Sequence, residues 1–307
     1  MNFSEFIKKY NWIILSVTAI VFLILLIWLN QKEKPIPDVP QVNIVKTQYD
    51  YSELSKIIAK SYYVYDINED EVIFSKNEHD KLPLASITKL MSGLVIKNHL
   101  PSTTTIEVGL NAIKREGDSG FAVGERWQLK KLLDFSLITS SNDGMCALAS
   151  ALNAYEAVSN KNTVSLMNEK AKEILLNDST FMNEDGLDVD VDNSGAYSSS
   201  YDTAHLLAYI INNNPDLVSA TVEEKEKIIS DSNISHEAKN TNISINRIPA
   251  IIASKTGYTE LAGGNLAVVY DAGFMHPVAV VVLGSTQEGR FSDVETLVKM
   301  SLQKLSE

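Results

Sequence analysis

The chain has 307 residues, of which 45% are hydrophobic and 21% charged, a composition typical of a globular protein with a sizeable core. Its formal charge of −12, with no basic patch in the sequence, argues against nucleic acid as a partner. The single cysteine, Cys146, excludes an internal disulfide, and its apolar neighbours indicate a small core residue.

An uncharged apolar run extends from Trp12 to Leu29. As a helix it would be about 27 Å long, close to the apolar thickness of a bilayer, with Trp12 and Trp28 at the two interfaces. A cleaved signal peptide is the alternative, but its apolar core is usually shorter and a small-residue cleavage site follows it. Here the polar stretch Asn30–Pro35 follows, so we expect residues 12–30 to be an uncleaved membrane anchor. Two lysines lie on each side of the run, so charge counting does not fix its orientation.

Three closely spaced prolines, Pro35, Pro37 and Pro40, come after the apolar run. Such spacing favours an extended, semi-rigid chain. We expect residues 31–53 to be a spacer that holds a folded domain, residues 54–307, away from the membrane surface.

The domain opens with two short β-rich runs, 61–65 and 71–74, whose intervening residues predict a hairpin. A helix is predicted from Ser86 to about Asn98. The spacing of apolar residues predicts further helices over 127–138, 143–152, 164–176 and 202–212.

The last third of the sequence changes character. Three β-rich runs predict strands over 250–255, 265–270 and 277–283, with a hairpin at 271–276 and a final helix over 292–305. A sheet that takes strands from both ends of the domain, around a mostly helical block, is an α+β arrangement. Its two lobes would form a cleft where they meet.

Ser86 and Lys89 lie three residues apart at the predicted helix start, so they share a face and the amine can reach the hydroxyl. Lys89 can take the proton of Ser86 only if it is neutral. Its pKa would have to fall by roughly 3 units, which burial or a second cation can supply. The pair therefore requires another lysine and a dry pocket.

Two later stretches meet that requirement. Ser140-Ser141-Asn142 lies between two predicted helices, where a hydroxyl and an amide can face a cleft. Lys255-Thr256-Gly257 is predicted at the end of a strand and offers the second cation, a hydroxyl and a glycine that permits close backbone approach.

These three motifs, in this order, resemble the signature of the penicillin-recognising serine acyl-enzymes. The longer runs Pro83–Met91 and Lys255–Gly263 are most similar to the D-alanyl-D-alanine carboxypeptidases, serine peptidase family S11, and the likeness spans roughly residues 55–307. The resemblance implies a β-lactamase/transpeptidase-like fold, with an antiparallel sheet flanked by helices, a mostly helical lobe and the active site at the lobe junction.

The resemblance also implies roles for individual residues. Ser86 would form an acyl-ester with the penultimate D-alanine of a peptidoglycan stem peptide, with Lys89 as its base. Ser140 would relay a proton to the leaving amine, and Asn142 would hold Lys89 or the substrate amide. Lys255 would keep Lys89 neutral by charge repulsion.

The resemblance implies a further set of residues that would bind the terminal carboxylate of the stem peptide or stabilise the developing oxyanion. They are Lys255, Thr256, Gly257, Tyr258, Thr259 and, as a looser match before the last helix, Arg290. The backbone N–H groups of Ser86 and Tyr258 would form the oxyanion hole. The resemblance implies no metal and no cofactor, and it implies β-lactam antibiotics as inhibitors.

Typical secreted members also have a second, β-rich domain and an amphipathic carboxyl-terminal tail, whereas this sequence stops after the helix at Leu305. We expect the amino-terminal span to replace that tail. Residues 1–11 would then be a short cytoplasmic tail and residues 54–307 an extracytoplasmic catalytic domain on a single-pass anchor.

Two motifs suggest other chemistry. Gly117–Gly120 spells the nucleophile loop of trypsin-like proteases, but the upstream histidines lack the context of that triad, so we expect a surface turn. Asp188–Asp192 suggests a calcium loop, but Asn193 and Ser199 stand where glycine and glutamate are required, so we expect a solvated acidic loop.

Three alternatives to a carboxypeptidase stay open. A peptidoglycan DD-endopeptidase shares every motif. A class A-like β-lactamase would need a glutamate that drives deacylation, and no convincing counterpart lies between Asn142 and Lys255. A non-catalytic cell-wall binding protein with this fold is disfavoured by the intact motifs.

Overall fold

The computed structural model describes residues 3–29 and 51–306, which belong to two separate compact units. The first unit contains helix α1, Phe3–Leu29, which begins well before the expected start at Trp12 and takes in most of the expected tail. Its stretch Asn11–Leu29 has a mean hydropathy of 2.8 and is long and apolar enough to cross a membrane.

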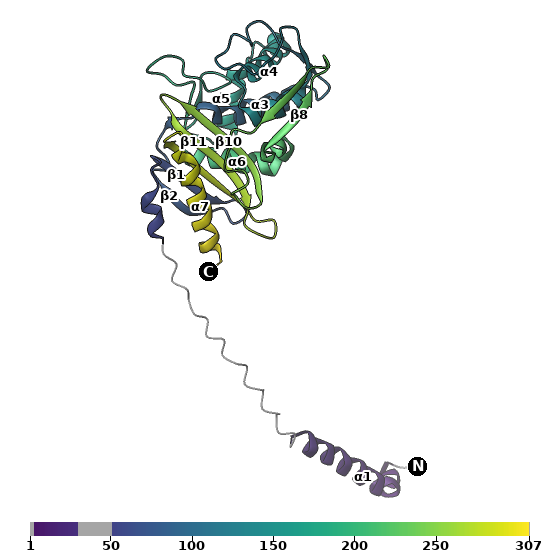
Figure 1. The fold of residues 1–307 in the computed structure, drawn as a ribbon. Helices are drawn as coiled ribbons and strands as arrows, with labels where there is room; N and C mark the ends of the chain where they lie inside the picture. The colour runs from purple at the N-terminus through teal and green to yellow at the C-terminus, as the bar shows by residue number, and fades with distance from the viewer. Residues whose placement is uncertain (1–2, 30–50, 307) are drawn as a thin grey trace. The chain divides into compact units, whose positions relative to one another are not determined.

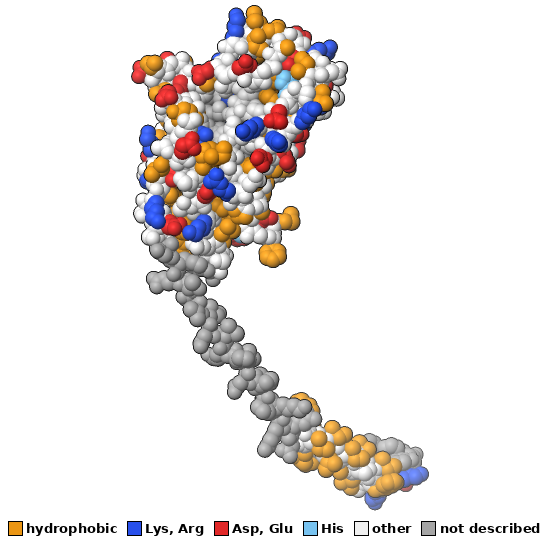
Figure 2. All heavy atoms as spheres, viewed as in Figure 1, with side chains coloured by type: hydrophobic (Ala, Val, Ile, Leu, Met, Phe, Trp, Pro, Cys, Tyr) orange, Lys and Arg blue, Asp and Glu red, His pale blue; other side chains and the backbone are white. Residues whose placement is uncertain are grey.

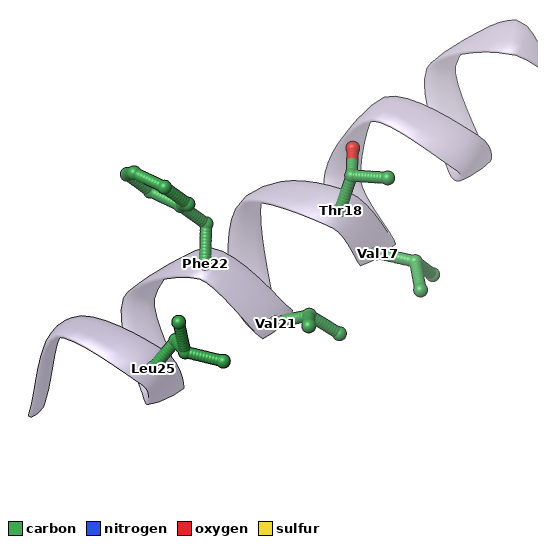
Figure 3. A pocket seen from close by; sticks show the side chains of 5 residues that line it. All are labelled: Val17, Thr18, Val21, Phe22 and Leu25. Atoms are coloured by element: carbon green, nitrogen blue, oxygen red, sulfur yellow. The ribbon is translucent and has the colours of Figure 1, made fainter. Parts of the chain in front are cut away.

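Hydrophobic side chains are exposed along α1 from Trp12 to Leu29, and charged side chains lie near its amino-terminal end (Figure 2). Figure 3 shows a hollow on this helix, lined by its own side chains Val17, Thr18, Val21, Phe22 and Leu25. The hollow is thus lined by side chains of a single helix, almost all of them apolar.

The expected spacer falls largely on residues 30–50, which lie outside the described part of the chain. Its last residues already belong to the domain, because the 3-10 helix η1, Ser52–Lys56, forms there. The Tyr51 ring packs edge-on against Phe74, with 5.5 Å between ring centroids. The folded domain thus begins slightly earlier than residue 54.

A five-stranded antiparallel sheet in the order β10-β11-β12-β1-β2 is the centre of the domain (Figure 1). Its strands are β1 Ser61–Asp66, β2 Glu71–Lys76, β10 Ile251–Thr259, β11 Gly263–Asp271 and β12 Pro277–Ser285. Both predicted hairpins are confirmed, and the pairing of β1 with β12 joins the two ends of the domain. The expected α+β fold is therefore correct.

The two faces of the sheet bury different helices, because side chains alternate along each strand. Helix α7, Gly289–Leu305, covers one face, where Val268 and Val280 pack in one core cluster with Val294 and Leu297. Figure 1 shows α7 lying across the sheet. The other face, with Val269 and Val281, belongs to the larger core of the helical lobe.

The helical lobe is built from helices between the two groups of strands. They are η2 Ala85–Thr88, α2 Lys89–His99, α3 Leu129–Thr139, α4 Asn142–Tyr155, η3 Glu156–Ser159, α5 Thr163–Glu173, α6 Ser200–Asn213, η4 Pro215–Leu217 and η5 Ser219–Val222. Short strands complete the lobe, namely β3 Leu82–Pro83, β4 Thr105–Glu107, β5 Arg126–Gln128, β6 Thr180–Phe181, β7 Ala196–Ser198, β8 Lys225–Ile229 and β9 Ser235–Lys239.

Several sequence predictions need correction. Trp127 does not begin a helix: it lies in β5, pairs with Ile106 of β4 and is fully buried, so α3 starts at Leu129. The hairpin of β8 and β9 was missed, because its exposed charged residues hide the alternation of apolar side chains. Lys255-Thr256-Gly257 lies inside β10 and not at its end, since pairing with β11 continues to Thr259.

Candidate active site

Ser86 lies in the 3-10 helix η2, and Lys89 is the first residue of α2. The preceding Ala85 has φ 49°, a left-handed conformation that is costly for a residue with a Cβ and that marks a constrained site. Lys89 is fully buried. Its Nζ lies 2.8 Å from the Ser86 Oγ, so the expected i, i+3 contact is made.

The other two partners of the Lys89 amine can only accept hydrogen bonds. They are the Asn142 Oδ1 at 2.6 Å and the backbone oxygen of Asp185 at 2.7 Å. A neutral amine donates two hydrogen bonds and has one lone pair. If Lys89 donates to these two oxygens, its lone pair faces the Ser86 hydroxyl, which is the arrangement that a base for Ser86 requires.

The charge of Lys89 is set by burial and by neighbouring groups. The pKa of Lys89 is lowered to about 8, chiefly by burial and to a smaller extent by Arg115, against the opposing influence of the carboxylates of Asp185, Glu184 and Asp143. A lysine in this range exchanges its proton near neutral pH, as a general base must.

Ser140 lies in the tight connection between α3 and α4, and Asn142 is the first residue of α4. Ser140 has φ 61°, also left-handed, and Ser141 caps α4 by accepting a hydrogen bond from the Gly144 N–H at 2.8 Å. The Asn142 Nδ2 donates to the Glu116 carbonyl at 2.8 Å, which turns the amide oxygen toward Lys89.

Lys255 of β10 brings the second amine to the site. Its side chain is buried, and its Nζ donates to the Ser140 Oγ at 2.7 Å and to the Thr256 carbonyl at 2.9 Å. Burial holds the pKa of Lys255 well below its usual value, and repulsion by Lys89 and Arg290 lowers it further. The two amines are therefore electrostatically coupled, and they bind Ser140 and Asn142, which lie two residues apart in the sequence.

The structure brings the predicted substrate-binding residues together less completely than the predicted catalytic residues. The Thr256 hydroxyl is 2.6 Å from that of Thr241, whereas the Thr259 hydroxyl donates to the Asp188 carboxylate at 2.9 Å. Tyr258 is 40% exposed. Arg290 lies in the first turn of α7 and not before it, and its guanidinium donates to the Gly257 carbonyl at 2.7 Å.

Two packing contacts hold the Ser86 segment against the sheet. A Cβ on Gly257 would lie 2.7 Å from the Leu84 carbonyl oxygen, so this position of β10 admits only glycine at that approach. Buried Asn265 of β11 donates through Nδ2 to the Pro83 and Leu84 carbonyls, at 2.9 and 3.1 Å. Sequence reasoning missed Asn265, because nothing in a strand pattern distinguishes it.

The two misleading motifs have structural explanations. Ser119 of the Gly117–Gly120 turn donates to the Asp143 carboxylate and so attaches this loop to the start of α4. In the acidic loop, Asp190 accepts from the N–H groups of Asp192 and Asn193. Among residues 3–29 and 51–306, no group of three or more His, Cys, Asp or Glu side chains could hold a metal ion.

Comparison with known families identifies the chain. The family model described as D-alanyl-D-alanine carboxypeptidase matches residues 46–287, well over half of the sequence. The chain therefore belongs to this family.

Curated members of the D-alanyl-D-alanine carboxypeptidase family are distant relatives. DacF of Bacillus subtilis is 28% identical over 252 residues, covering 80% of this chain and 62% of the relative. DacD of Escherichia coli is 27% identical over 263 residues, covering 82% of this chain and 65% of the relative. The chain thus spans less than two thirds of the length of these two carboxypeptidases.

Solved structures of similar fold include a D-alanyl-D-alanine carboxypeptidase from Mycobacterium tuberculosis, with a TM-score of 0.69 at 22% identity. That match covers 80% of this chain and 91% of the other. Penicillin-binding protein D2 from Listeria monocytogenes, in its ampicillin-bound form, gives a TM-score of 0.65 at 23% identity, covering 80% and 97%. The penicillin-binding, transpeptidase-like fold expected from the motifs is confirmed.

Proposed function

We propose that the protein is a serine-type D-Ala-D-Ala carboxypeptidase that removes the terminal D-alanine from peptidoglycan stem peptides. The observation that carries the proposal is the buried Lys89 amine, 2.8 Å from the Ser86 hydroxyl and fixed by two oxygens that can only accept. Membership of the carboxypeptidase family supports the choice of substrate.

In the first step Lys89 takes the Ser86 proton as Oγ attacks the carbonyl carbon of the penultimate D-alanine. The backbone N–H groups of Ser86 and Tyr258 stabilise the developing oxyanion, and a donor of this kind typically contributes about 10²–10³ in rate. The close approach of β10 to the segment before Ser86, required at Gly257, supports this pairing of donors.

The peptide C–N bond then breaks, and the terminal D-alanine leaves with a proton on its amine. This proton is the one that Lys89 took from Ser86, so Lys89 becomes neutral again, and Ser140, whose hydroxyl is hydrogen-bonded to the Lys255 amine, relays it. Water next attacks the acyl-ester, with Lys89 again as the base, which releases the shortened peptide and restores Ser86. The residues themselves supply every proton transfer in this sequence.

Lys255, Thr256, Thr259 and Arg290 attract the terminal carboxylate of the substrate. The Nε of Arg290 is buried with no hydrogen-bond partner among the described residues, so this donor is unpaired. An arriving carboxylate favours the charged form of Lys255. Because the two amines repel each other, a proton gained by Lys255 promotes loss of the proton from Lys89. Substrate binding would thereby prepare the base.

We also propose that α1 anchors the protein in the cell membrane as a single-pass helix, with the catalytic domain on the extracytoplasmic side. The length and hydropathy of Asn11–Leu29 support the anchor. The outward placement follows from the substrate, because peptidoglycan lies outside the membrane.

The decisive experiment is incubation of the protein with a fluorescent penicillin, followed by mass spectrometry of the labelled peptide. We expect stable labelling at Ser86, no labelling of Ser86→Ala, and normal labelling of Ser159→Ala, an exposed serine of η3. Rapid turnover of the label would indicate a β-lactamase, and absence of labelling a binding protein. Either result would contradict the proposal.

Muropeptide analysis tests the substrate. After treatment with the enzyme, stem pentapeptides should lose one alanine while cross-linked dimers persist. Cleavage of the dimers without loss of alanine would identify an endopeptidase instead.

A further inference from the structure

A cluster of three charged side chains lies beside the Lys89 amine and has no part in the mechanism above. Arg115 donates through NH2 to the Glu184 carboxylate at 2.5 Å, and its Nε lies 3.4 Å from the Asp185 carboxylate. The Asp185 side chain is fully buried, and the backbone carbonyl of the same residue accepts from Lys89. The cluster is thus connected directly to the proposed base.

The Asp185 carboxyl group is fixed in place. One of its oxygens accepts from the Leu187 N–H at 3.1 Å, and the other has no hydrogen-bond partner within the described chain, only the nearby Arg115 charge. Gly186 has φ 81°, which a glycine adopts without strain, so the chain can turn here. A Cβ at this position would also lie 2.0 Å from the Ala85 carbonyl oxygen. The segment is packed against the strained backbone that precedes Ser86.

Two carboxylates next to a buried amine favour its ammonium form, which cannot act as a base. A guanidinium that pairs with both carboxylates cancels most of their field at the amine, and arginine keeps its charge at every relevant pH. The charge balance of the cluster therefore adds to the effect of burial on how readily Lys89 loses its proton.

We propose that Arg115 is a positioning residue that keeps Lys89 available as the base for Ser86 by cancelling the charges of Glu184 and Asp185. The inference rests on the proposed function and assigns to that site a residue outside its three sequence motifs.

The charged groups around Lys89 agree with this assignment. The carboxylates of Asp185, Glu184 and Asp143 oppose the burial that lowers the pKa of Lys89, whereas Arg115 acts in the same direction as burial. Lys255 of β10 is the other basic group at the site, and burial together with repulsion by Lys89 holds its pKa well below the usual value. Arg115, in contrast, keeps its charge at every relevant pH.

The test measures the second-order rate of Ser86 acylation by a fluorescent penicillin as a function of pH. The acid limb of this profile is the low-pH side, where the rate falls as Lys89 becomes protonated. In Arg115→Gln this limb should move about one pH unit toward alkaline pH, so acylation at pH 7 should be about tenfold slower. In Glu184→Gln the limb should move the other way. The double variant should return close to the wild-type profile.

Two further variants separate charge from structure. Arg115→Lys keeps the cation and should keep the limb near its wild-type position. Arg247→Gln removes an exposed arginine that pairs with Glu295 at 3.0 Å, and it should leave the profile unchanged. If both single substitutions slow the reaction without moving the limb, and the double variant does not recover, the role of the cluster is purely structural and the inference is wrong.

A second readout does not depend on acylation. The pKa of Lys89, followed through its ¹³Cε chemical shift in the unreacted protein, should rise in Arg115→Gln. If the wild-type protein is never acylated, the proposed function is wrong, and the Lys89 pKa measurement still tests the inference. If the wild-type protein is acylated but the pKa of Lys89 is unchanged in Arg115→Gln, only the inference is wrong.

Discussion

At the scale of single residues, the chemistry depends on how two buried lysines share protons. Lys89 and Lys255 are both buried, and repulsion by Lys89 lowers the pKa of Lys255. Groups coupled in this way titrate as a pair, so a measured acid limb belongs to the pair. The hydrogen bonds nevertheless distinguish the two, since Lys89 contacts the Ser86 hydroxyl and Lys255 that of Ser140.

The pH dependence of acylation follows from this pairing. With the pKa of Lys89 lowered to about 8, the fraction of neutral amine falls tenfold for each pH unit below that value. The amine is half neutral at pH 8, so the second-order rate of acylation should drop about 50-fold between pH 8 and pH 6. Stopped-flow labelling would measure it, with circular dichroism at each pH as a control for folding. A rate that stays constant over this range would rule out Lys89 as the base.

At the scale of elements, the active site depends on the contact between β10 and the segment that carries Ser86. Gly257 permits the backbones to approach, and Asn265 of β11 accepts from the Gly284 N–H while donating to the carbonyls before Ser86. The sheet thus fixes the backbone before the nucleophile, through the close approach at Gly257 and the hydrogen bonds of the Asn265 side chain.

Substitution of Gly257 by alanine tests this contact. The added Cβ would lie 2.7 Å from a backbone oxygen, so either β10 or η2 must shift. We expect a loss of about 1–3 kcal/mol in the free energy of unfolding and acylation at least tenfold slower. Denaturant unfolding and penicillin labelling would measure the two effects.

Gly109→Ala is the matched control, because a Cβ there meets nothing within 4 Å. Its stability and labelling rate should stay close to those of the wild type. A Gly257→Ala protein that behaves like this control would show that the close approach has no functional role.

At the scale of the whole molecule, the chain consists of a membrane-type helix and a separate domain with its own core. The domain closes on itself through the pairing of β1 with β12, and its two core clusters lie on opposite faces of one sheet. Both clusters consist of domain residues, so the domain has what it needs to fold without α1.

Removal of residues 1–50 should therefore leave the domain folded. We expect its melting temperature to stay within about 2 °C of that of the detergent-solubilised full chain, with an unchanged rate of Ser86 labelling, because no domain core residue is lost. Differential scanning calorimetry and labelling would check this. A truncated domain that unfolds or loses labelling would show that the anchor contributes to the fold.

The sequence by itself determined the elements with strong periodicity and the local pairs of the site. Apolar spacing predicted the sheet strands and most of the helices, and the i, i+3 spacing of Ser86 and Lys89 dictated their contact before any fold was known. Family resemblance then placed the motifs in one site. These features are visible because they depend on neighbours within one turn or one strand.

Only the tertiary structure decided what depends on residues distant in the sequence. Trp127 follows a helical pattern, yet pairing with β4 draws it into a strand. Arg115, Asp185 and Asn265 lie outside the three signature motifs, and they reach the site because loops and strands far apart in the chain pack there. The charge state of a buried lysine is the sum of such neighbours, so it is a property of the folded molecule and not of the Ser-x-x-Lys motif.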